Sequence, residues 1–148
     1  MRIFITGVAG MLGSHLSELL IKESHSVIGV DNLEVGKLQN LKKIKNNKKF
    51  KFIKSNLNNK KIIESQIKKS DLIVHFAAIK KVSELQSSFK TLDVNVNTTR
   101  MILDIIKKYK KRLIFASTSD VYGVSKKLPF NESDDLVIGQ SLARRWAY

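Results

Sequence analysis

The chain has 148 residues and a formal net charge of +14, and 43% of its residues are hydrophobic. This length and hydrophobic content suffice for one globular domain with its own core. It has no cysteine and three scattered histidines, which excludes disulfides and thiolate metal sites and predicts no metal site. No apolar run reaches the length of a signal peptide or a membrane span, so we expect a cytoplasmic protein without membrane contact.

The positive charge raises the question of a nucleic-acid partner, because basic surfaces attract phosphate groups. Lysine supplies 22 of the 27 basic residues, and these lysines are spread over many segments of the chain. Aromatic residues are not interleaved with them, as a base-stacking surface would require. We therefore predict a solvated, lysine-rich surface and no nucleic-acid partner.

Short apolar runs alternate along the chain with stretches of helical period, a pattern typical of β-α-β units and a parallel sheet. Five strands are expected, at residues 2–6, 27–30, 50–54, 72–76 and 113–116. Leucines at helical spacing predict a first helix over Leu12 to Leu20 that ends near residues 23–25.

Two later helices are expected, a weak one around residues 58–69 and a longer one over about 91–109. One face of the longer helix is marked by Val96, Thr99, Ile102, Leu103 and Ile106. The structure of the lysine- and asparagine-rich connection before the third strand is not predicted, and the segment from Ser117 onward is interpreted as loop.

The stretch T-G-V-A-G-M-L-G, residues 6–13, lies between the first strand and the first helix. There Gly7 permits a tight turn, Gly10 lets the backbone approach a pyrophosphate, and Gly13 allows close packing of helix on strand. The helix N-terminus adds N–H groups that attract an anion. The spacing G-x-x-G-x-x-G departs from the common G-x-G-x-x-G, so a purely structural glycine turn remains an alternative.

Asp31 follows the second strand, at the distance where a carboxylate accepts both ribose hydroxyls of an adenosine. A carboxylate at this place would repel a 2′-phosphate, which favours NAD over NADP. Strand, glycine turn, helix and acid in this order predict a dinucleotide site.

Several further motifs occur in order: V-D-N-L at 30–33, V-H-F-A-A at 74–78, V-N-V-N-T-T at 94–99, S-T-S-D-V-Y-G at 117–123 and R-W-A-Y at 145–148. With these motifs the chain resembles the extended short-chain dehydrogenase/reductase family, the NAD-dependent nucleotide-sugar epimerases, dehydratases and decarboxylases. The resemblance implies an α/β fold with a Rossmann-like doubly wound parallel sheet. The sheet would be incomplete, with about five strands and without the C-terminal substrate domain.

The resemblance also implies roles for individual residues around NAD. The pyrophosphate would lie against Gly7, Gly10, Met11, Leu12 and Gly13, and the adenosine ribose against Asp31 and Asn32. The adenine would lie beside Asn56 and Leu57, although the family usually has aspartate at the position of Asn56. The remaining cofactor residues implied are Phe76, Ala77, Ala78, Lys80 and Asn95.

Three of these motif residues have simpler alternatives. Lys80 is equally well one of many solvated lysines. Asn95 could instead form local backbone hydrogen bonds at the start of a helix. His75 at the end of a strand is interpreted as a satisfied core or turn histidine without a catalytic role.

For catalysis, the resemblance implies Tyr148 as the base and Thr118 as the hydroxyl residue that shares its hydrogen bond to the sugar oxygen. Tyrosine is a poor base at neutral pH without a nearby positive charge, which the family supplies with a lysine four residues later. The printed sequence stops at Tyr148. We therefore expect residues 1–148 to be an NAD-binding domain truncated at this tyrosine, inactive by itself, with a homodimer possible only for a longer protein.

The stretch S-T-S-D-V-Y-G discriminates among the family's reactions. Dehydratases carry an Asp-Glu pair after the threonine, where this chain has Ser119 and Asp120, so 4,6-dehydration is disfavoured. A UDP-sugar 4-epimerase is expected first and a UDP-glucuronate-type decarboxylase second. A dinucleotide-binding chain without catalysis remains the alternative of a different class, and Asp120 could be a structural carboxylate.

Overall fold

The computed structural model describes residues 1–79, 88–123, 128–135 and 137. Five parallel strands form one sheet in the order β3-β2-β1-β4-β5. The strands are β1 (Arg2–Thr6), β2 (Ser26–Asp31), β3 (Phe50–Lys54), β4 (Leu72–His75) and β5 (Arg112–Phe115). All five expected strands are present, and their bounds differ from the expected ones by at most one residue at either end.

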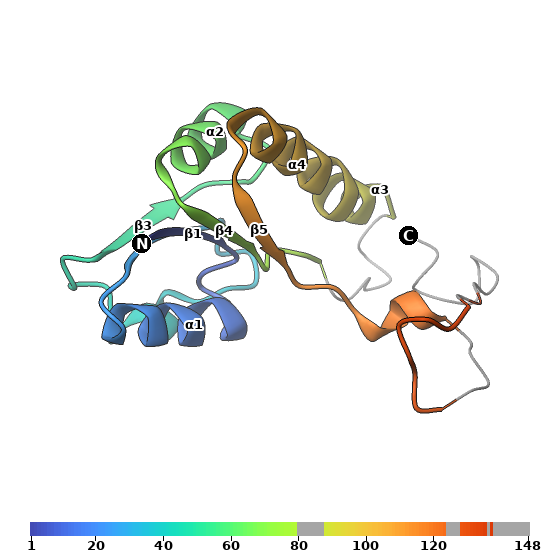
Figure 1. Ribbon diagram of the computed structural model, residues 1–148. Coiled ribbons are helices and arrows are strands. Elements are labelled where there is room, and N and C mark those ends of the chain that lie inside the picture. The colour runs from blue at the N-terminus through green and yellow to red at the C-terminus, as the bar shows by residue number, and fades with distance from the viewer. Residues whose placement is uncertain (80–87, 124–127, 136, 138–148) are drawn as a thin grey trace.

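Helices cover both faces of this sheet, so the doubly wound α/β fold is confirmed (Figure 1). Helix α1 (Met11–Lys22) lies on one face, and α2 (Lys60–Lys69) and α4 (Thr98–Tyr109) lie on the other. Short elements complete the described part: the 3₁₀ helices η1 (Leu38–Leu41) and η3 (Ser119–Tyr122), α3 (Ser88–Leu92) and the π-helix η2 (Asp93–Asn97).

The alternation of side chains along β1 creates two separate cores. Ile3 and Ile5 belong to the cluster on the α1 side, whereas Phe4 belongs to the cluster with α2 and α4. Because successive side chains of a strand point to opposite faces, a strand buried on both faces is apolar throughout. β1 therefore lies at the centre of the sheet, between β2 and β4.

The order in which strands are added to the sheet switches sides at the neighbouring strands β1 and β4. After β1 the chain builds β2 and then β3 on one side, and it then crosses back to place β4 and β5 on the other side. Such a switch point leaves a crevice outside the carboxyl ends of the strands, where ligands bind in open α/β sheets.

The buried face of α1 agrees only in part with the one that its leucines mark, since Leu16 and Leu20 pack against the α1-side core as expected. Leu12 and Leu19 are exposed, whereas Gly13, Ser14 and Ser17 are buried. The hydroxyl of Ser17 donates to the carbonyl of Gly13 at 2.7 Å, so this small polar side chain is satisfied inside its own helix. Small residues on the inner face let the helix backbone approach the sheet more closely than leucines would allow.

The inward face of α4 is also rotated from the predicted one. Val96 and Leu103 are exposed, whereas Thr98 and Ile105 are buried together with the expected Ile102 and Ile106. The predicted helix over 91–109 is three consecutive helical segments, of which the middle one is the π-helix η2. A π-turn adds a residue to the helical repeat. The regular spacing of about 3.6 residues therefore does not hold across residues 93–97, and it places Val96 on the wrong face of the helix.

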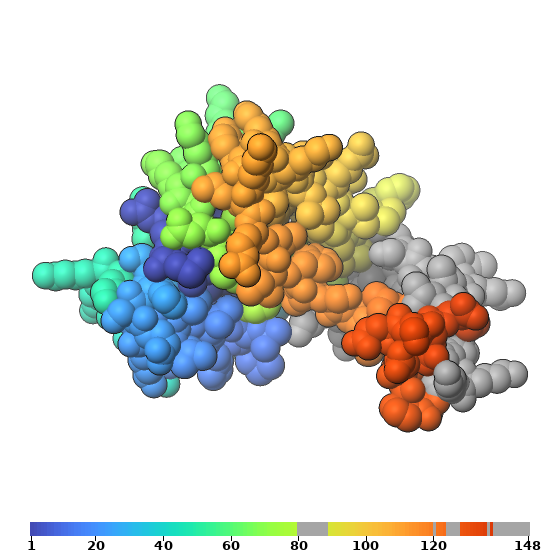
Figure 2. Space-filling view, in the orientation of Figure 1, coloured from blue at the N-terminus to red at the C-terminus, as the bar shows by residue number. Residues whose placement is uncertain are grey.

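The connection before β3 and the segment after β5 complete the description. Leu41 and Ile44 from the connection are buried in the α1-side core, a contribution that the sequence did not predict. Ile114 and Phe115 of β5 are about half exposed, at 52% and 51%, and Figure 2 shows the orange side chains of this region at the visible surface. The segment from Ser117 onward, expected as loop, contains the short helix η3.

Candidate functional site

The glycine-rich turn is the strand-to-helix bend that its sequence predicts. Gly7 has a φ of 70°, in the left-handed region that favours glycine, and its N–H donates to the carbonyl of Val30 at 2.9 Å. A Cβ on Gly7 would lie 2.8 Å from the backbone nitrogen of Ala77. Gly7 therefore brings the ends of β1, β2 and β4 together.

The other two glycines of the turn have different surroundings. A Cβ on Gly13 would lie 2.3 Å from the carbonyl oxygen of Gly7 and 2.7 Å from Cα of Val8, so this glycine is required by packing. A Cβ on Gly10 would have one tight contact, at 3.2 Å with the carbonyl oxygen of Gly7, and otherwise open space. Packing alone does not explain glycine at position 10, whereas the approach of a ligand to the backbone does.

Gly10 is also the N-cap of α1, and no side chain caps this helix end. The next two residues, Met11 and Leu12, are 68% and 50% exposed. The first N–H groups of a helix have no acceptor within the helix, and together with the helix dipole they form a site for an anion. The backbone at residues 10–13 thus offers donors at an open surface.

The carboxylate of Asp31 joins this turn to the end of β2. One of its oxygens accepts from the N–H of Ala9 at 3.0 Å, and the other accepts from the N–H of Leu33 at 2.8 Å. Each carboxylate oxygen has two lone pairs, so both can accept one further hydrogen bond. The carboxylate is thereby fixed in orientation beside the turn, as the predicted pairing with a ribose diol requires.

A loop that the sequence analysis did not single out supports the same turn. Asn40 donates from Nδ2 to the carbonyl of Ala9 at 2.7 Å, and the N–H of Lys37 donates to the same oxygen at 3.1 Å. A Cβ on Gly36 would lie 2.8 Å from Oδ2 of Asp31. Gly36, in D-N-L-E-V-G, was the residue from which this loop contact could have been predicted, because a glycine shortly after a strand-end acid indicates a close backbone approach.

The predicted adenine residues lie at the ends of β2 and β3. Asn32 donates from Nδ2 to Oδ1 of Asn56 at 2.9 Å, which ties the two strand ends together. Leu57 packs against the core cluster formed with α2 and α4. Asn56, which stands where the family usually has aspartate, therefore accepts a hydrogen bond from the amide of Asn32. Its side chain is exposed.

The segment after β4, which carries Phe76, Ala77 and Ala78, is held by Asn95. This side chain accepts from the N–H of Ile79 at 2.8 Å and donates to the carbonyl of Ile79 at 3.0 Å. The alternative of local helix-start hydrogen bonds for Asn95 is wrong, because these bonds reach a residue 16 positions away. Asn95 therefore positions the segment rather than capping its own helix.

His75 at the end of β4 is buried and has a hydroxyl partner on each ring nitrogen. Nδ1 lies 2.6 Å from Oγ1 of Thr6, and Nε2 lies 2.9 Å from Oγ1 of Thr99. Burial lowers the pKa of His75 to about 4, so the ring is neutral at physiological pH. This agrees with the interpretation of His75 as a satisfied core histidine.

The hydroxyl of Thr6 connects His75 to the segment after β4, because it also accepts from the N–H of Ala77 at 3.3 Å. The chain of groups from Ala77 through Thr6 and His75 to Thr99 spans the ends of β1 and β4 and the start of α4. No pattern in the sequence indicates these contacts, since the residues involved are far apart along the chain.

Some predicted residues are not brought into this arrangement. Thr118 is exposed after the end of β5. Lys80 and the proposed base Tyr148 lie outside the described residues. In the described part of the chain, no group of three His, Cys, Asp or Glu side chains is suited to hold a metal ion, and no helix has the length and apolar character to span a membrane.

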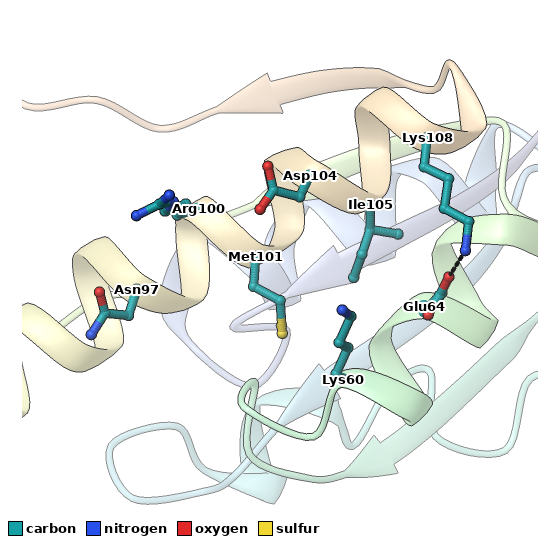
Figure 3. Close-up of a pocket in the computed structure, with 8 residues that line it drawn as sticks. All are labelled: Lys60, Glu64, Asn97, Arg100, Met101, Asp104, Ile105 and Lys108. Carbon is teal, nitrogen blue, oxygen red and sulfur yellow. Dashed lines mark hydrogen bonds and ion pairs between the residues drawn. The ribbon is translucent and has the colours of Figure 1, made fainter.

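A hollow of about 310 Å³ between α2 and α4 is separate from the predicted site, since no predicted site residue lines it (Figure 3). Both charge signs line it, since Lys60, Arg100 and Lys108 lie among Glu64 and Asp104. Nζ of Lys108 lies 2.7 Å from the carboxylate of Glu64, and this hydrogen bond holds the pKa of Glu64 below its ordinary value.

Comparison with known proteins identifies relatives in sequence and in fold. A UDP-N-acetyl-alpha-D-glucosaminuronate decarboxylase of Bacillus cytotoxicus is 38% identical over 148 residues, which cover 99% of this chain and 45% of that protein. The chain thus spans less than half the length of the curated relatives that it matches.

Two solved structures are similar over almost the whole chain. A UDP-N-acetylglucosamine 4-epimerase from Methanobrevibacter ruminantium has a TM-score of 0.84 and 28% identity, and the match covers 93% of this chain and 44% of that one. A dTDP-glucose 4,6-dehydratase from Bacillus anthracis, solved in complex with NAD, has a TM-score of 0.81 and 32% identity, and the match covers 95% and 45%.

The family model for GDP-mannose 4,6 dehydratase matches residues 4–139, which run from within β1 to beyond η3. The relatives found are nucleotide-sugar epimerases, decarboxylases and dehydratases. The chain therefore belongs to the GDP-mannose 4,6 dehydratase family, among the short-chain dehydrogenase/reductase-type enzymes of nucleotide-sugar metabolism.

Proposed function

We propose that residues 1–148 are the NAD-binding domain of a nucleotide-sugar-modifying enzyme. The observation that carries this proposal is the open space at Gly10, above uncapped helix N–H groups and beside the fixed carboxylate of Asp31. The similar dehydratase from Bacillus anthracis was solved with NAD. These residues fit a dinucleotide because they offer donors for a diphosphate and acceptors for a diol at one edge of the sheet.

In this proposal the backbone at Gly7, Gly10, Met11, Leu12 and Gly13 holds the pyrophosphate. Asp31, with Asn32, accepts the hydroxyls of the adenosine ribose, and its negative charge disfavours a 2′-phosphate, so NAD is preferred to NADP. Asn56 and Leu57 adjoin the adenine. The segment Phe76 to Ala78, positioned by Asn95 and followed by Lys80, lies beneath the cofactor.

For the reaction we propose a UDP-sugar 4-epimerase type, in which NAD, when bound, supplies a reversible hydride acceptor. Tyr148 would take the proton from the sugar hydroxyl, and Thr118 would share a hydrogen bond with the same oxygen. A tyrosine requires a nearby positive charge to act as a base at neutral pH. We therefore expect NAD binding to be measurable on the 148-residue polypeptide, and turnover to require such a cation beside Tyr148.

A sugar-acid decarboxylase is the second candidate, favoured by the 38% identical decarboxylase of Bacillus cytotoxicus. In a protein that carries these residues together with a lysine beside Tyr148, incubation with NAD and either UDP-glucose or UDP-glucuronate distinguishes the two activities, since one yields UDP-galactose and the other releases carbon dioxide. Turnover of either substrate by the printed chain would contradict the proposed need for a lysine beside Tyr148.

The binding proposal is tested by thermal unfolding with and without NAD, because a ligand that binds only the folded state raises its stability by RT ln(1 + [L]/Kd). The informative variant is Gly10→Ala. Its methyl group enters the open space over the turn with one tight contact, at 3.2 Å, so we expect near-normal stability and an NAD affinity reduced by about tenfold or more. Lys22→Ala, an exposed change at the other end of α1, is the matched control.

Two results would overturn the binding proposal. One is an unchanged melting temperature at millimolar NAD for a chain that is folded by circular dichroism. The other is equal affinity for NAD in Gly10→Ala and in the Lys22→Ala control. A preference for NADP over NAD would refute the assignment of Asp31 to the ribose while leaving the pyrophosphate site intact.

A further inference from the structure

The amino ends of the strands, at the opposite edge of the sheet from the glycine turn, carry a second and strongly basic feature. A hollow of about 280 Å³ there is lined by five cationic side chains. They are Arg2 at the start of β1, Lys48, Lys49 and Lys51 around the start of β3, and Lys69 at the end of α2. Segments far apart in the sequence thus direct their charges to one place.

No carboxylate lines this hollow among the residues that the structure describes. The hollow between α2 and α4 differs, since Glu64 and Asp104 lie among its cations. A high lysine content by itself distributes cations over the surface together with the acids present. The gathering of cations without acids in the hollow at the strand starts is therefore a local property of the fold.

The nearest acid in sequence to the hollow, Asp71, has a structural partner. Its Oδ2 accepts from the backbone N–H of Arg2 at 2.7 Å. The guanidinium of Arg2 donates to the carbonyl of Lys69 at 3.4 Å, which places these two cationic residues side by side at the rim. Neither contact neutralises the side chains of Lys48, Lys49 and Lys51.

The basic character continues along the same edge of the sheet. Lys110, Lys111 and Arg112 precede or begin β5, whose first residue pairs with Leu72 of β4. In a parallel sheet all strand starts share one edge. Cations therefore lie at this edge both in the hollow near the start of β3 and at the start of β5, with Asp71 before β4 between them.

We infer that this hollow is a binding site for a linear oligophosphate. A chain of linked phosphates places several negative charges a few ångströms apart, which matches cations clustered around a small hollow. Nucleic acid is a poorer match, because no aromatic side chain is among the described lining residues to stack on a base. Lysine suits such a ligand as a point charge that contacts phosphate oxygens without a fixed geometry.

The test is a calorimetric titration of the 148-residue chain with sodium tripolyphosphate. A triple variant, Lys48→Ala with Lys49→Ala and Lys69→Ala, removes three cations of the hollow. The matched control, Lys42→Ala with Lys45→Ala and Lys107→Ala, removes three exposed lysines from elsewhere and leaves the same net charge. Circular dichroism verifies the fold of both variants.

We expect the hollow variant to bind tripolyphosphate about tenfold or more weakly and the control to change by about twofold or less. The dependence of affinity on salt should also become shallower in the hollow variant, because fewer ionic contacts are formed. Equal weakening of both variants would assign the binding to net charge and overturn the inference. The inference would also be overturned if the chain bound a single-stranded oligonucleotide more tightly than tripolyphosphate and the hollow variant lost this affinity. The partner would then be a nucleic acid.

This inference does not depend on the proposed function. The glycine turn lies at the carboxyl ends of the strands, and none of the residues substituted here adjoins it. Tripolyphosphate bound at the turn would be lost in Gly10→Ala and retained in the hollow variant, which would overturn the inference and leave the NAD proposal standing.

Discussion

The buried histidine at the end of β4 predicts a specific dependence of stability on pH. Burial lowers the pKa of His75 from 6.5 to about 4, while the unfolded chain keeps the ordinary value. Between these two pH values the unfolded state binds more protons than the folded state, so stability falls as pH falls. The difference of about 2.5 pKa units corresponds to a loss of about 3 kcal/mol between pH 7 and pH 4.

The assay is urea unfolding of the chain at several pH values from 7.5 to 4, compared with that of His75→Gln. Glutamine keeps one donor and one acceptor and does not titrate. We expect this variant to be less stable at pH 7, because it replaces a packed ring bonded to Thr6 and Thr99, and to show a flatter dependence on pH. His15→Gln, a change of an exposed histidine, is the control and should keep the slope of the wild type.

The lowered pKa of Glu64 does not produce the same difference between wild type and variant. The pKa of Glu64 is also lowered, so its contribution is present above its ordinary value of 4.5 and is lost as pH falls further. That loss is common to the wild type and the variant and cancels in their difference. An unchanged slope in His75→Gln, or a histidine NMR titration that gives His75 a pKa above 6, would refute the reasoning.

Two further substitutions test the architecture of the site. Gly13→Ala should destabilise the chain by about 1–3 kcal/mol in urea unfolding, because its Cβ would lie 2.3 Å from the rigid backbone oxygen of Gly7; stability equal to that of Gly10→Ala would contradict the different roles of these glycines. Asn95→Ala should cost about 2 kcal/mol, because it leaves the N–H and carbonyl of Ile79 without their partner. The control Asn97→Ala removes an exposed amide bonded to Asp93 in the same helical segment and should cost less than about 0.5 kcal/mol.

The strand pattern and the glycine turn were predictable from the sequence because each is a local property. The central strands β1 and β4 are short apolar runs, because a doubly covered strand is apolar on both sides. The edge strand β3 keeps lysines among its apolar residues. Gly7, Gly10 and Gly13 mark a strand-to-helix bend because each is required within a few residues of its neighbours. Asp31 could be assigned to the same site from its distance along the chain.

The helix faces and the supporting contacts were decided by the tertiary structure. Leu19 has the spacing of a core residue but is exposed, while Ser17 is buried, because the helix must approach the sheet closely and small residues permit it. The π-turn at Asp93–Asn97 separates the exposed Val96 from the buried face of α4, and periodicity does not reveal this turn. The spacing of apolar residues along a helix indicates which residues share a face. How closely the helix packs on the sheet decides which of them are buried.

What the sequence by itself determined is therefore the order of elements, the parallel sheet and the glycine turn between the first strand and the first helix, since these follow from short-range pattern. Only the tertiary structure decided that Asn95 holds Ile79, that His75 links Thr6 to Thr99, and that basic residues from separate strands surround one hollow. These features join residues that are many positions apart, and their partners are chosen by how the layers pack rather than by any local preference of the chain.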